Sequence, residues 1–151
     1  MSDVVLFEEL MCDNDKKIGL ITLNSPKSLN ALSSEMIDLL YPQLLRWQQQ
    51  SSISIIIVQG EGEKAFCAGG DIVHLYQAMS SPSNHESQIS PVENYFTHEY
   101  QLDYLIHTFN KPVLVWGSGI VMGGGLGLMA GASHRVVTET SRIAMPEISI
   151  G

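Results

Sequence analysis

The chain has 151 residues, of which 44% are hydrophobic, so it is long enough for one globular domain with a packed core. Sixteen acidic residues against eight Lys and Arg give a formal net charge of -8, which opposes nonspecific binding to nucleic acid or to an anionic membrane. Cys12 and Cys67 lack the spacing of a metal site or redox pair and predict free thiols in a reducing compartment. The N-terminus resembles no signal or transit peptide, and no apolar run approaches the ~18 residues of a membrane span. We therefore expect a cytoplasmic protein.

The first third of the chain predicts strands, a helix and another strand. Residues 4–10 and 18–23 are β-rich runs separated by a polar turn, which indicates a hairpin. From a predicted N-cap at Ser33 or Ser34, apolar residues recur at helical spacing as far as Trp47. Residues 53–58 are almost wholly apolar, as expected for a strand buried on both faces of a parallel or mixed sheet. This order favours an α/β fold.

Glycine-bearing turns follow two of the predicted strands. The first, over 60–71, ends at Asp71, the predicted N-cap of a helix over 72–79. The second, over 116–131, holds seven of the thirteen glycines and leads from the triplet 123–125 into a buried helix. Amides at a helix start have no partner inside the helix, and glycine lets a ligand approach them closely. If each turn offers one N–H, the pair can hold an oxygen that becomes negative during reaction, which suits carbonyl or thioester chemistry.

Other readings of the glycines remain open. The triplet also fits tight helix packing or a buried turn. Dinucleotide binding competes, because Glu139 lies twenty residues after Gly119, but Met122 stands where that motif needs its third glycine. The phosphate-binding loop of nucleotide hydrolases and the nucleophile elbow of serine hydrolases are absent from the sequence. The five histidines form no recognisable ligand spacing, so no metal is expected.

Two segments near the end of the chain place acids among apolar residues. After a polar insertion over 80–90, a helix beginning at Pro91 carries Glu99 and Asp103 at the same helical spacing as apolar side chains, Phe96 among them. Glu147 is the sole ionisable residue of the run 143–151, which follows a predicted strand over 134–138. Partial desolvation there would raise the pKa of Glu147 towards the range useful for a base or nucleophile. The alternatives are the edge of a helix face for Glu99 and a surface turn for Glu147.

Three segments resemble the crotonase, or enoyl-CoA hydratase/isomerase, superfamily. They are 64–71 (Lys-Ala-Phe-Cys-Ala-Gly-Gly-Asp), 119–127 (Gly-Ile-Val-Met-Gly-Gly-Gly-Leu-Gly) and 145–151 (Met-Pro-Glu-Ile-Ser-Ile-Gly). The resemblance implies an α/β crotonase-like spiral of ββα units, truncated at its C-terminus, with 1–151 as the N-terminal part of a single domain. It also implies an acyl-coenzyme A substrate, no tightly bound cofactor and a possible homo-oligomer of the full-length protein.

The resemblance further implies roles for individual residues. Glu147 is expected to be the catalytic carboxylate, and the oxyanion hole is expected from the amides of Ala68 or Gly69 and of Gly124. Further substrate contacts are expected at Gly70, Asp71 and Glu99. With so negative a chain, the coenzyme A phosphates need local cations, and we expect these to be Lys27 and Lys64, each beside a predicted loop.

Within the superfamily, the motifs most resemble the 3-hydroxyisobutyryl-CoA hydrolases of valine catabolism. The hydratases carry a second catalytic glutamate two residues after the glycine triplet, where this sequence has Gly127. Hydrolysis of a short 3-hydroxyacyl-CoA is therefore the expected reaction. Hydratase or isomerase activity on acyl-CoA is the alternative, and a non-catalytic acyl-CoA-binding or assembly fragment is a second one.

Overall fold

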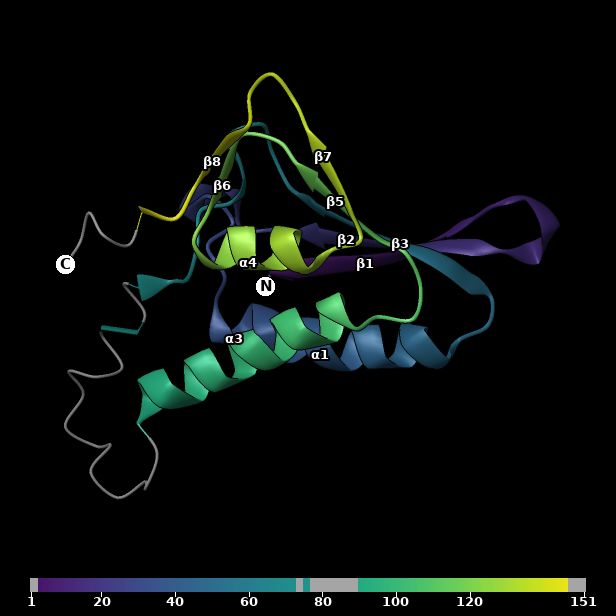
Figure 1. Ribbon diagram of the computed structural model, residues 1–151, viewed down its shortest axis with the longest axis horizontal. Helices are drawn as coiled ribbons and strands as arrows, with labels where there is room; N and C mark the ends of the chain where they lie inside the picture. Colours follow the sequence, from purple (N-terminus) through teal and green to yellow (C-terminus); the bar gives the residue numbers. More distant parts are fainter. Residues whose placement is uncertain (1–2, 73–74, 77–89, 147–151) are drawn as a thin grey trace.

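The computed structural model describes residues 3–72, 75–76 and 90–146, which form two β-sheets with helices packed against them (Figure 1). The larger sheet contains, in spatial order, β1 (Val5–Met11), β2 (Lys17–Leu23), β3 (Ile53–Gly60), β5 (Val113–Gly117) and β7 (His134–Val137). The smaller sheet contains β4 (Ala65–Cys67), β6 (Ile120–Met122) and β8 (Arg142–Ala144). The helices are α1 (Ser34–Gln49), α3 (Pro91–His107) and α4 (Gly124–Gly131), with short 3-10 turns at η1 (Asp13–Asp15) and η2 (Pro26–Ser28).

From β3 onwards, consecutive strands of the chain alternate between the larger and the smaller sheet. Strands β1 and β2 form the predicted antiparallel hairpin, whereas β2, β3, β5 and β7 pair in parallel. Each later strand of the larger sheet is followed by a strand of the smaller one, so that β3 leads to β4, β5 to β6 and β7 to β8. Helix α4 follows the β5–β6 pair and α1 follows the hairpin. The predicted α/β spiral of ββα units is therefore confirmed.

The two long helices begin where their caps predict. The Ser33 side chain accepts a hydrogen bond from the Met36 amide at 3.2 Å, and Ser90 and Glu93 form a reciprocal capping box at the start of α3. Both helices lie on one side of the larger sheet, with α4 between α3 and the strands (Figure 1). Their buried side chains join those of both sheets in one hydrophobic core.

Some local expectations need correction. Strands β4, β6 and β8 lie in segments that the sequence predicts only as glycine turns or as an unassigned apolar run. Phe96, predicted on the apolar stripe of α3, is 41% exposed. Of the helix predicted over 72–79, only Ile72, Leu75 and Tyr76 are described, and the insertion over 80–89 lies outside the described residues. Both cysteines are free thiols, as predicted.

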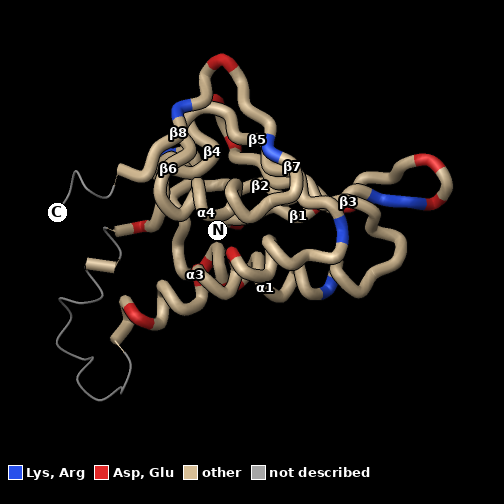
Figure 2. The backbone as a smooth tube through the Cα atoms, viewed as in Figure 1, with Lys and Arg blue, Asp and Glu red and all other residues tan. Residues whose placement is uncertain are grey.

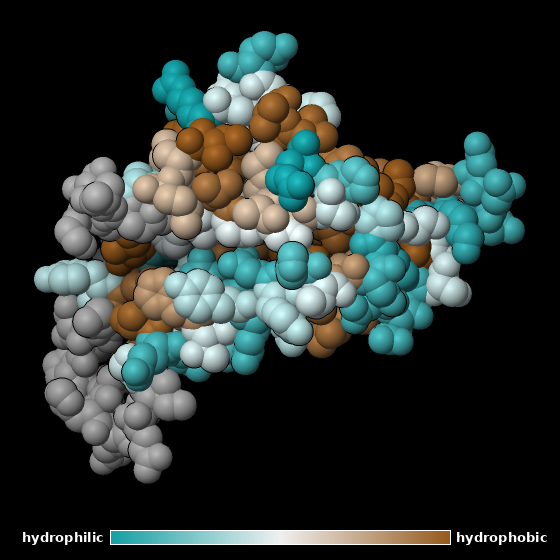
Figure 3. Space-filling model, viewed as in Figure 1, coloured by the Kyte–Doolittle hydropathy of each residue, from teal (hydrophilic) through white to brown (hydrophobic). Residues whose placement is uncertain are grey.

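Charged residues of both signs occur in many elements of the part of the chain that the structure describes. Acidic and basic residues are spread along the chain, and the β1–β2 turn carries both signs (Figure 2). Exposed apolar side chains lie on the smaller sheet and the strands beside it (Figure 3), at Trp116, Val137, Ile143 and Met145. Among the described helices, none combines the length and apolar character of a membrane span.

Asn30 connects the loop after β2 to the loop before β4. Its fully buried side chain donates hydrogen bonds to the carbonyls of Glu61 (3.0 Å) and Ala65 (2.9 Å) and accepts one from the Ser25 amide (2.9 Å). Its φ of 53° is in the left-handed region, which asparagine tolerates better than most residues. One side chain thus holds together two loops that are far apart in the sequence.

We predict that Asn30→Ala lowers the free energy of unfolding by about 3 kcal/mol, because it leaves one buried and two partly buried backbone groups without this partner. Urea unfolding followed by the fluorescence of the buried Trp47 measures the change. Asn24→Ala is the matched control, since Asn24 makes one exposed hydrogen bond to the Asp3 carbonyl, and it is expected to cost about 0.5 kcal/mol. Equal losses in the two variants would contradict a connecting role for Asn30.

Candidate active site

The start of α4 lies directly against β4 and α3 because it has no side chains. A Cβ atom on Gly125 would overlap the Cys67 carbonyl oxygen, and one on Gly124 would overlap Glu99 Oε1. The first helical hydrogen bond described here runs from the Gly127 amide to the Gly123 carbonyl at 3.0 Å. The amides of the first turn, including that of Gly124, therefore precede the helical hydrogen-bond ladder.

The first glycine turn, over 60–71, is held by Leu32, which lies just before α1, and by α3. The Leu32 amide donates to the Gly69 carbonyl (2.7 Å), and the Asp71 amide donates to the Leu32 carbonyl (3.0 Å). The Tyr95 hydroxyl donates to the same Leu32 carbonyl at 2.7 Å. Burial, and then the nearby charge of Glu99, raise the pKa of Tyr95, so this phenol keeps its proton. The backbone around Gly70 is thus fixed from two sides.

The structure brings the two glycine turns together. The position that a Cβ atom would take on Gly124 lies 3.6 Å from the Gly70 nitrogen. The covalent bonds from that position to the Gly124 nitrogen add at most about 3 Å, so the two amide nitrogens lie within about 7 Å of each other. That spacing is compatible with two donors that converge on one ligand oxygen, each at about 3 Å.

The structure corrects the expectation for Ala68. Its amide donates to the Leu29 carbonyl at 3.1 Å, so this N–H already has an acceptor within the protein. The Cys67 thiol donates to the Gly69 carbonyl at 3.8 Å, and burial raises the pKa of Cys67 to about 11. For the Gly70 amide, no acceptor occurs in residues 3–72, 75–76 and 90–146. Gly70, rather than Ala68, is therefore the candidate partner of Gly124.

Two acids of α3 face α4. Glu99 is only 5% exposed, and its Oε1 occupies the space that a side chain on Gly124 would need. Asp103 Oδ2 lies 2.8 Å from the position of a Cβ atom on Gly127, and its Oδ1 is buried without a hydrogen-bond partner in the described structure. Burial raises the pKa of Asp103 to about 6. The sequence placed Asp103 on the helical stripe but did not indicate its contact with Gly127.

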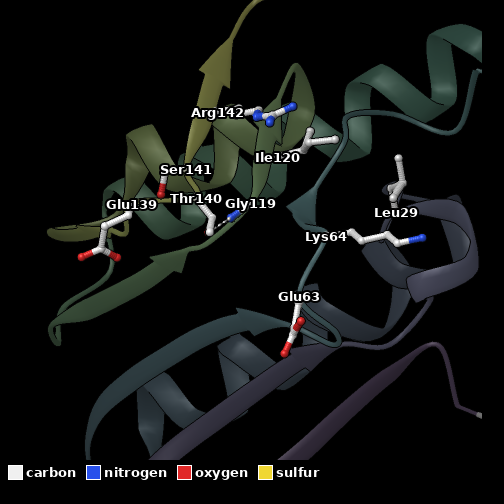
Figure 4. A pocket seen from close by; sticks show the side chains of 9 residues that line it. All are labelled: Leu29, Glu63, Lys64, Gly119, Ile120, Glu139, Thr140, Ser141 and Arg142. Carbon is white, nitrogen blue, oxygen red and sulfur yellow. Dashed lines mark hydrogen bonds between the residues drawn. The ribbon is translucent and has the colours of Figure 1, made fainter.

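Lys27 and Lys64 line the same cavity. This cavity, of about 320 Å³, lies between residues 26–30 and 61–65, the two loops that Asn30 connects. Lys64 also lines a neighbouring cavity of about 600 Å³, whose other side is formed by the turn 139–142 (Figure 4). Glu61 and Glu63 share these walls, so the surroundings of the lysines are of mixed charge. From Lys64, strand β4 leads to Ala68 over four residues, about 13 Å if extended.

The remaining expected site residues are placed in part. Asp71 lines a third cavity, of about 460 Å³, with Leu75 and Tyr95. Glu147 lies outside the described residues. The strand that precedes it in the sequence, β8, lies next to the glycine triplet 123–125. Strand β8 pairs with β6, and the Gly123 amide donates to the Ala144 carbonyl at 3.3 Å. No group of three or more potential metal ligands is found among the described residues.

Comparison with known proteins supports the fold described above. The family model of enoyl-CoA hydratase/isomerase matches residues 18–151. The mitochondrial 3-hydroxyisobutyryl-CoA hydrolase of Danio rerio is 46% identical over 97% of this chain and 36% of its own length. The small ribosomal subunit protein mS47 of Neurospora crassa is 38% identical over 95% of this chain and 28% of its own length. The crystal structure of an enoyl-CoA hydratase from Rhodobacter sphaeroides 2.4.1 superposes with a TM-score of 0.83, at 33% identity, over 98% of this chain and 41% of that one. The chain thus spans about a third of the length of the curated relatives it matches.

We predict that Asp103→Asn stabilises the fold more as pH rises. The folded state holds the Asp103 proton with a pKa of about 6, above the value of 3.8 for an exposed aspartate. The stability contributed by protonated Asp103 is therefore full below about pH 4 and lost as pH rises through about 6. The Tm of Asp103→Asn minus that of the parent should increase between these values and then level off. Glu8→Gln, at an exposed position of β1, is the control, and the same trend in both variants would contradict the assignment.

Proposed function

The chain belongs to the enoyl-CoA hydratase/isomerase family, and we propose that it forms part of an enzyme that hydrolyses the thioester of a short 3-hydroxyacyl-coenzyme A. The observation that carries the proposal is the meeting of two glycine turns at Gly124 and Gly70, whose amide nitrogens lie within about 7 Å of each other. The identity with a 3-hydroxyisobutyryl-CoA hydrolase supports the choice of reaction within the family.

In the proposed reaction, the thioester carbonyl oxygen accepts hydrogen bonds from the amides of Gly124 and Gly70. Glu147 removes a proton from water, whose oxygen adds to the carbonyl carbon, or attacks that carbon itself before water releases the acid. The oxygen becomes negative in the tetrahedral intermediate, and the two fixed N–H groups stabilise it more than they stabilise the neutral carbonyl. When Glu147 acts as base, the carbon–sulfur bond then breaks and coenzyme A leaves as a thiol with the proton that Glu147 took from water. When Glu147 attacks, coenzyme A leaves first as a thiolate that is protonated by solvent, and water then hydrolyses the acyl-glutamate anhydride to the free acid and the Glu147 carboxylate.

Two further contacts account for the class of substrate. Glu99, buried beside Gly124, is proposed to orient the 3-hydroxyl group of the acyl chain. Lys27 and Lys64 are proposed to bind coenzyme A phosphates in the cavity between their loops. The length of β4 separates these cations from the carbonyl site, which suits a long ligand that is charged at one end and reactive at the other.

Two other functions are each favoured by one observation. The likeness to an enoyl-CoA hydratase favours addition of water to a double bond, although Gly127 has no side chain to act as a second acid. The likeness to a small ribosomal subunit protein favours a role in an assembly without catalysis. Both are tested by the activity measurements that follow.

We predict that Glu147→Gln in the full-length protein lowers thioester hydrolysis at least ~10²-fold, the lower end of what a positioned acid–base group contributes. Thiol release from 3-hydroxyisobutyryl-CoA is followed with a thiol reagent. Glu139→Gln is the matched control and is expected to keep the parent rate. Glu139 is an exposed carboxylate that lines the cavity of about 600 Å³ beside the turn 139–142.

The same preparations are tested with crotonyl-CoA by loss of its enoyl absorbance. Rapid hydration without thiol release would favour the hydratase function over hydrolysis. Absence of both reactions in the parent protein would favour the assembly role. A Glu147→Gln protein as active as the parent would remove Glu147 from the mechanism.

We predict that the double change Lys27→Ala with Lys64→Ala weakens coenzyme A binding about tenfold, because two partly exposed charge pairs contribute up to about 1 kcal/mol each. Isothermal titration calorimetry with coenzyme A at low salt measures this. The control is Lys16→Ala with Arg46→Ala, which removes the same charge from the β1–β2 turn and from α1, away from the cavity. It distinguishes direct binding of phosphate by Lys27 and Lys64 from the effect of the protein's net charge on coenzyme A affinity. Equal affinity in both double variants would show that neither lysine binds a phosphate.

A further inference from the structure

The backbone of Gly70 is oriented by Leu32, which lies just before α1. The Leu32 amide donates to the Gly69 carbonyl (2.7 Å), and the Leu32 carbonyl accepts from the Asp71 amide (3.0 Å). Leu32 and Gly70 therefore form an isolated parallel β-bridge. In such a bridge Leu32 bonds only to the two neighbours of Gly70, so the N–H of Gly70 itself points to the opposite edge. The Gly70 nitrogen lies 3.6 Å from the position that a Cβ atom would take on Gly124.

The Leu32 carbonyl is held from a second direction by Tyr95 on α3. The Tyr95 hydroxyl donates to this carbonyl at 2.7 Å, beside the bond from the Asp71 amide. A carbonyl oxygen has two lone pairs, so the two donors use its full capacity. Leu32 is 0% exposed and Tyr95 is 3% exposed, so water has no access to replace the hydroxyl. The same hydroxyl lies 2.9 Å from the position of a Cβ atom on Gly70, directly against the backbone that it orients.

Tyr95 is itself held in a defined position. It follows the capping box of α3, in which the Ser90 hydroxyl accepts from the Glu93 amide (3.1 Å) and the Glu93 carboxylate accepts from the Ser90 amide (3.2 Å). The cap fixes the first turn of the helix, from which Tyr95 projects. The Phe96 ring packs edge-on against the Tyr95 ring, with centroids 5.3 Å apart and planes at 80°. Helix start and ring contact together restrict where the hydroxyl can lie.

We propose that Tyr95 is a positioning residue for the oxyanion hole, which sets the direction of the Gly70 N–H by holding the Leu32 carbonyl. It acts on the substrate only through Gly70, and this role rests on the proposed function, in which the Gly70 amide donates to the thioester oxygen. A hydrogen bond weakens steeply when its donor turns away, so a misdirected amide stabilises the oxyanion less. Loss of the hydroxyl should therefore slow the chemical step without weakening substrate binding.

The orientation of Gly70 is tested without substrate in Tyr95→Phe, which keeps the ring and removes only the hydroxyl. In the ¹⁵N-labelled full-length protein, residual dipolar couplings report the direction of each N–H bond, and relaxation reports its mobility. We expect the Gly70 coupling to change, or its order parameter to fall below about 0.6, whereas the amide of Val115 in the core keeps both values. Tyr104→Phe, at an exposed position of α3, is the control and should change neither amide. An unchanged Gly70 amide, or an equal change at Val115, would overturn the proposal.

The consequence for catalysis is tested by thiol release from 3-hydroxyisobutyryl-CoA in the same full-length proteins. Removal of one oxyanion donor costs about 10²–10³ in kcat, and a displaced donor should cost less. We therefore expect Tyr95→Phe to lower kcat about tenfold with KM within about twofold of the parent value, and Tyr104→Phe to match the parent. An unchanged kcat, or a rise in KM alone, would overturn the positioning role. If the parent releases no thiol, the proposed function is overturned, and the NMR result still supports or overturns the orientation of Gly70 by Tyr95.

Discussion

The absence of side chains at the start of α4 is the constraint on which the site depends. Gly125 lets the helix backbone lie on β4, and Gly124 and Gly127 admit the acids of α3. A side chain at any of these positions would separate elements whose polar groups now meet. Close packing and exposed helix amides therefore have one cause here, and the two readings that the sequence left open for the glycine triplet are not alternatives.

The fold was predictable where its signals are local. The hairpin, α1, β3 and α3 follow from alternation, helical spacing and caps such as Ser33 and the Ser90–Glu93 box. Strands β4, β6 and β8 were missed because each has three residues and is defined by its partners. Ala65, Ile120 and Arg142 pair across the small sheet although more than twenty residues separate each from the next. No sequence pattern within one such segment shows that it is a strand.

The candidate site was predictable to the level of the segment, but not of the atom. Glycines and their order indicated two turns that cooperate, and the resemblance supplied residue types for the site. Tertiary packing produces the hydrogen bond from the Ala68 amide to the Leu29 carbonyl and the contact of Asp103 with Gly127. Neither can be predicted from the composition of the sequence or from the spacing of its residues. The common cavity of Lys27 and Lys64 likewise depends on Asn30, a buried side chain in a loop that reads as an ordinary turn.

The pairing of α3 acids with α4 glycines also limits how the family can diverge. Gly124 and Glu99 share one volume, and Gly127 and Asp103 share another. A larger residue on α4 requires a smaller or reoriented one on α3, so the two positions of each pair are constrained to change together. Substitution histories should then show covariation between positions 99 and 124 and between 103 and 127, with intermediates that carry only one change of a pair being rare.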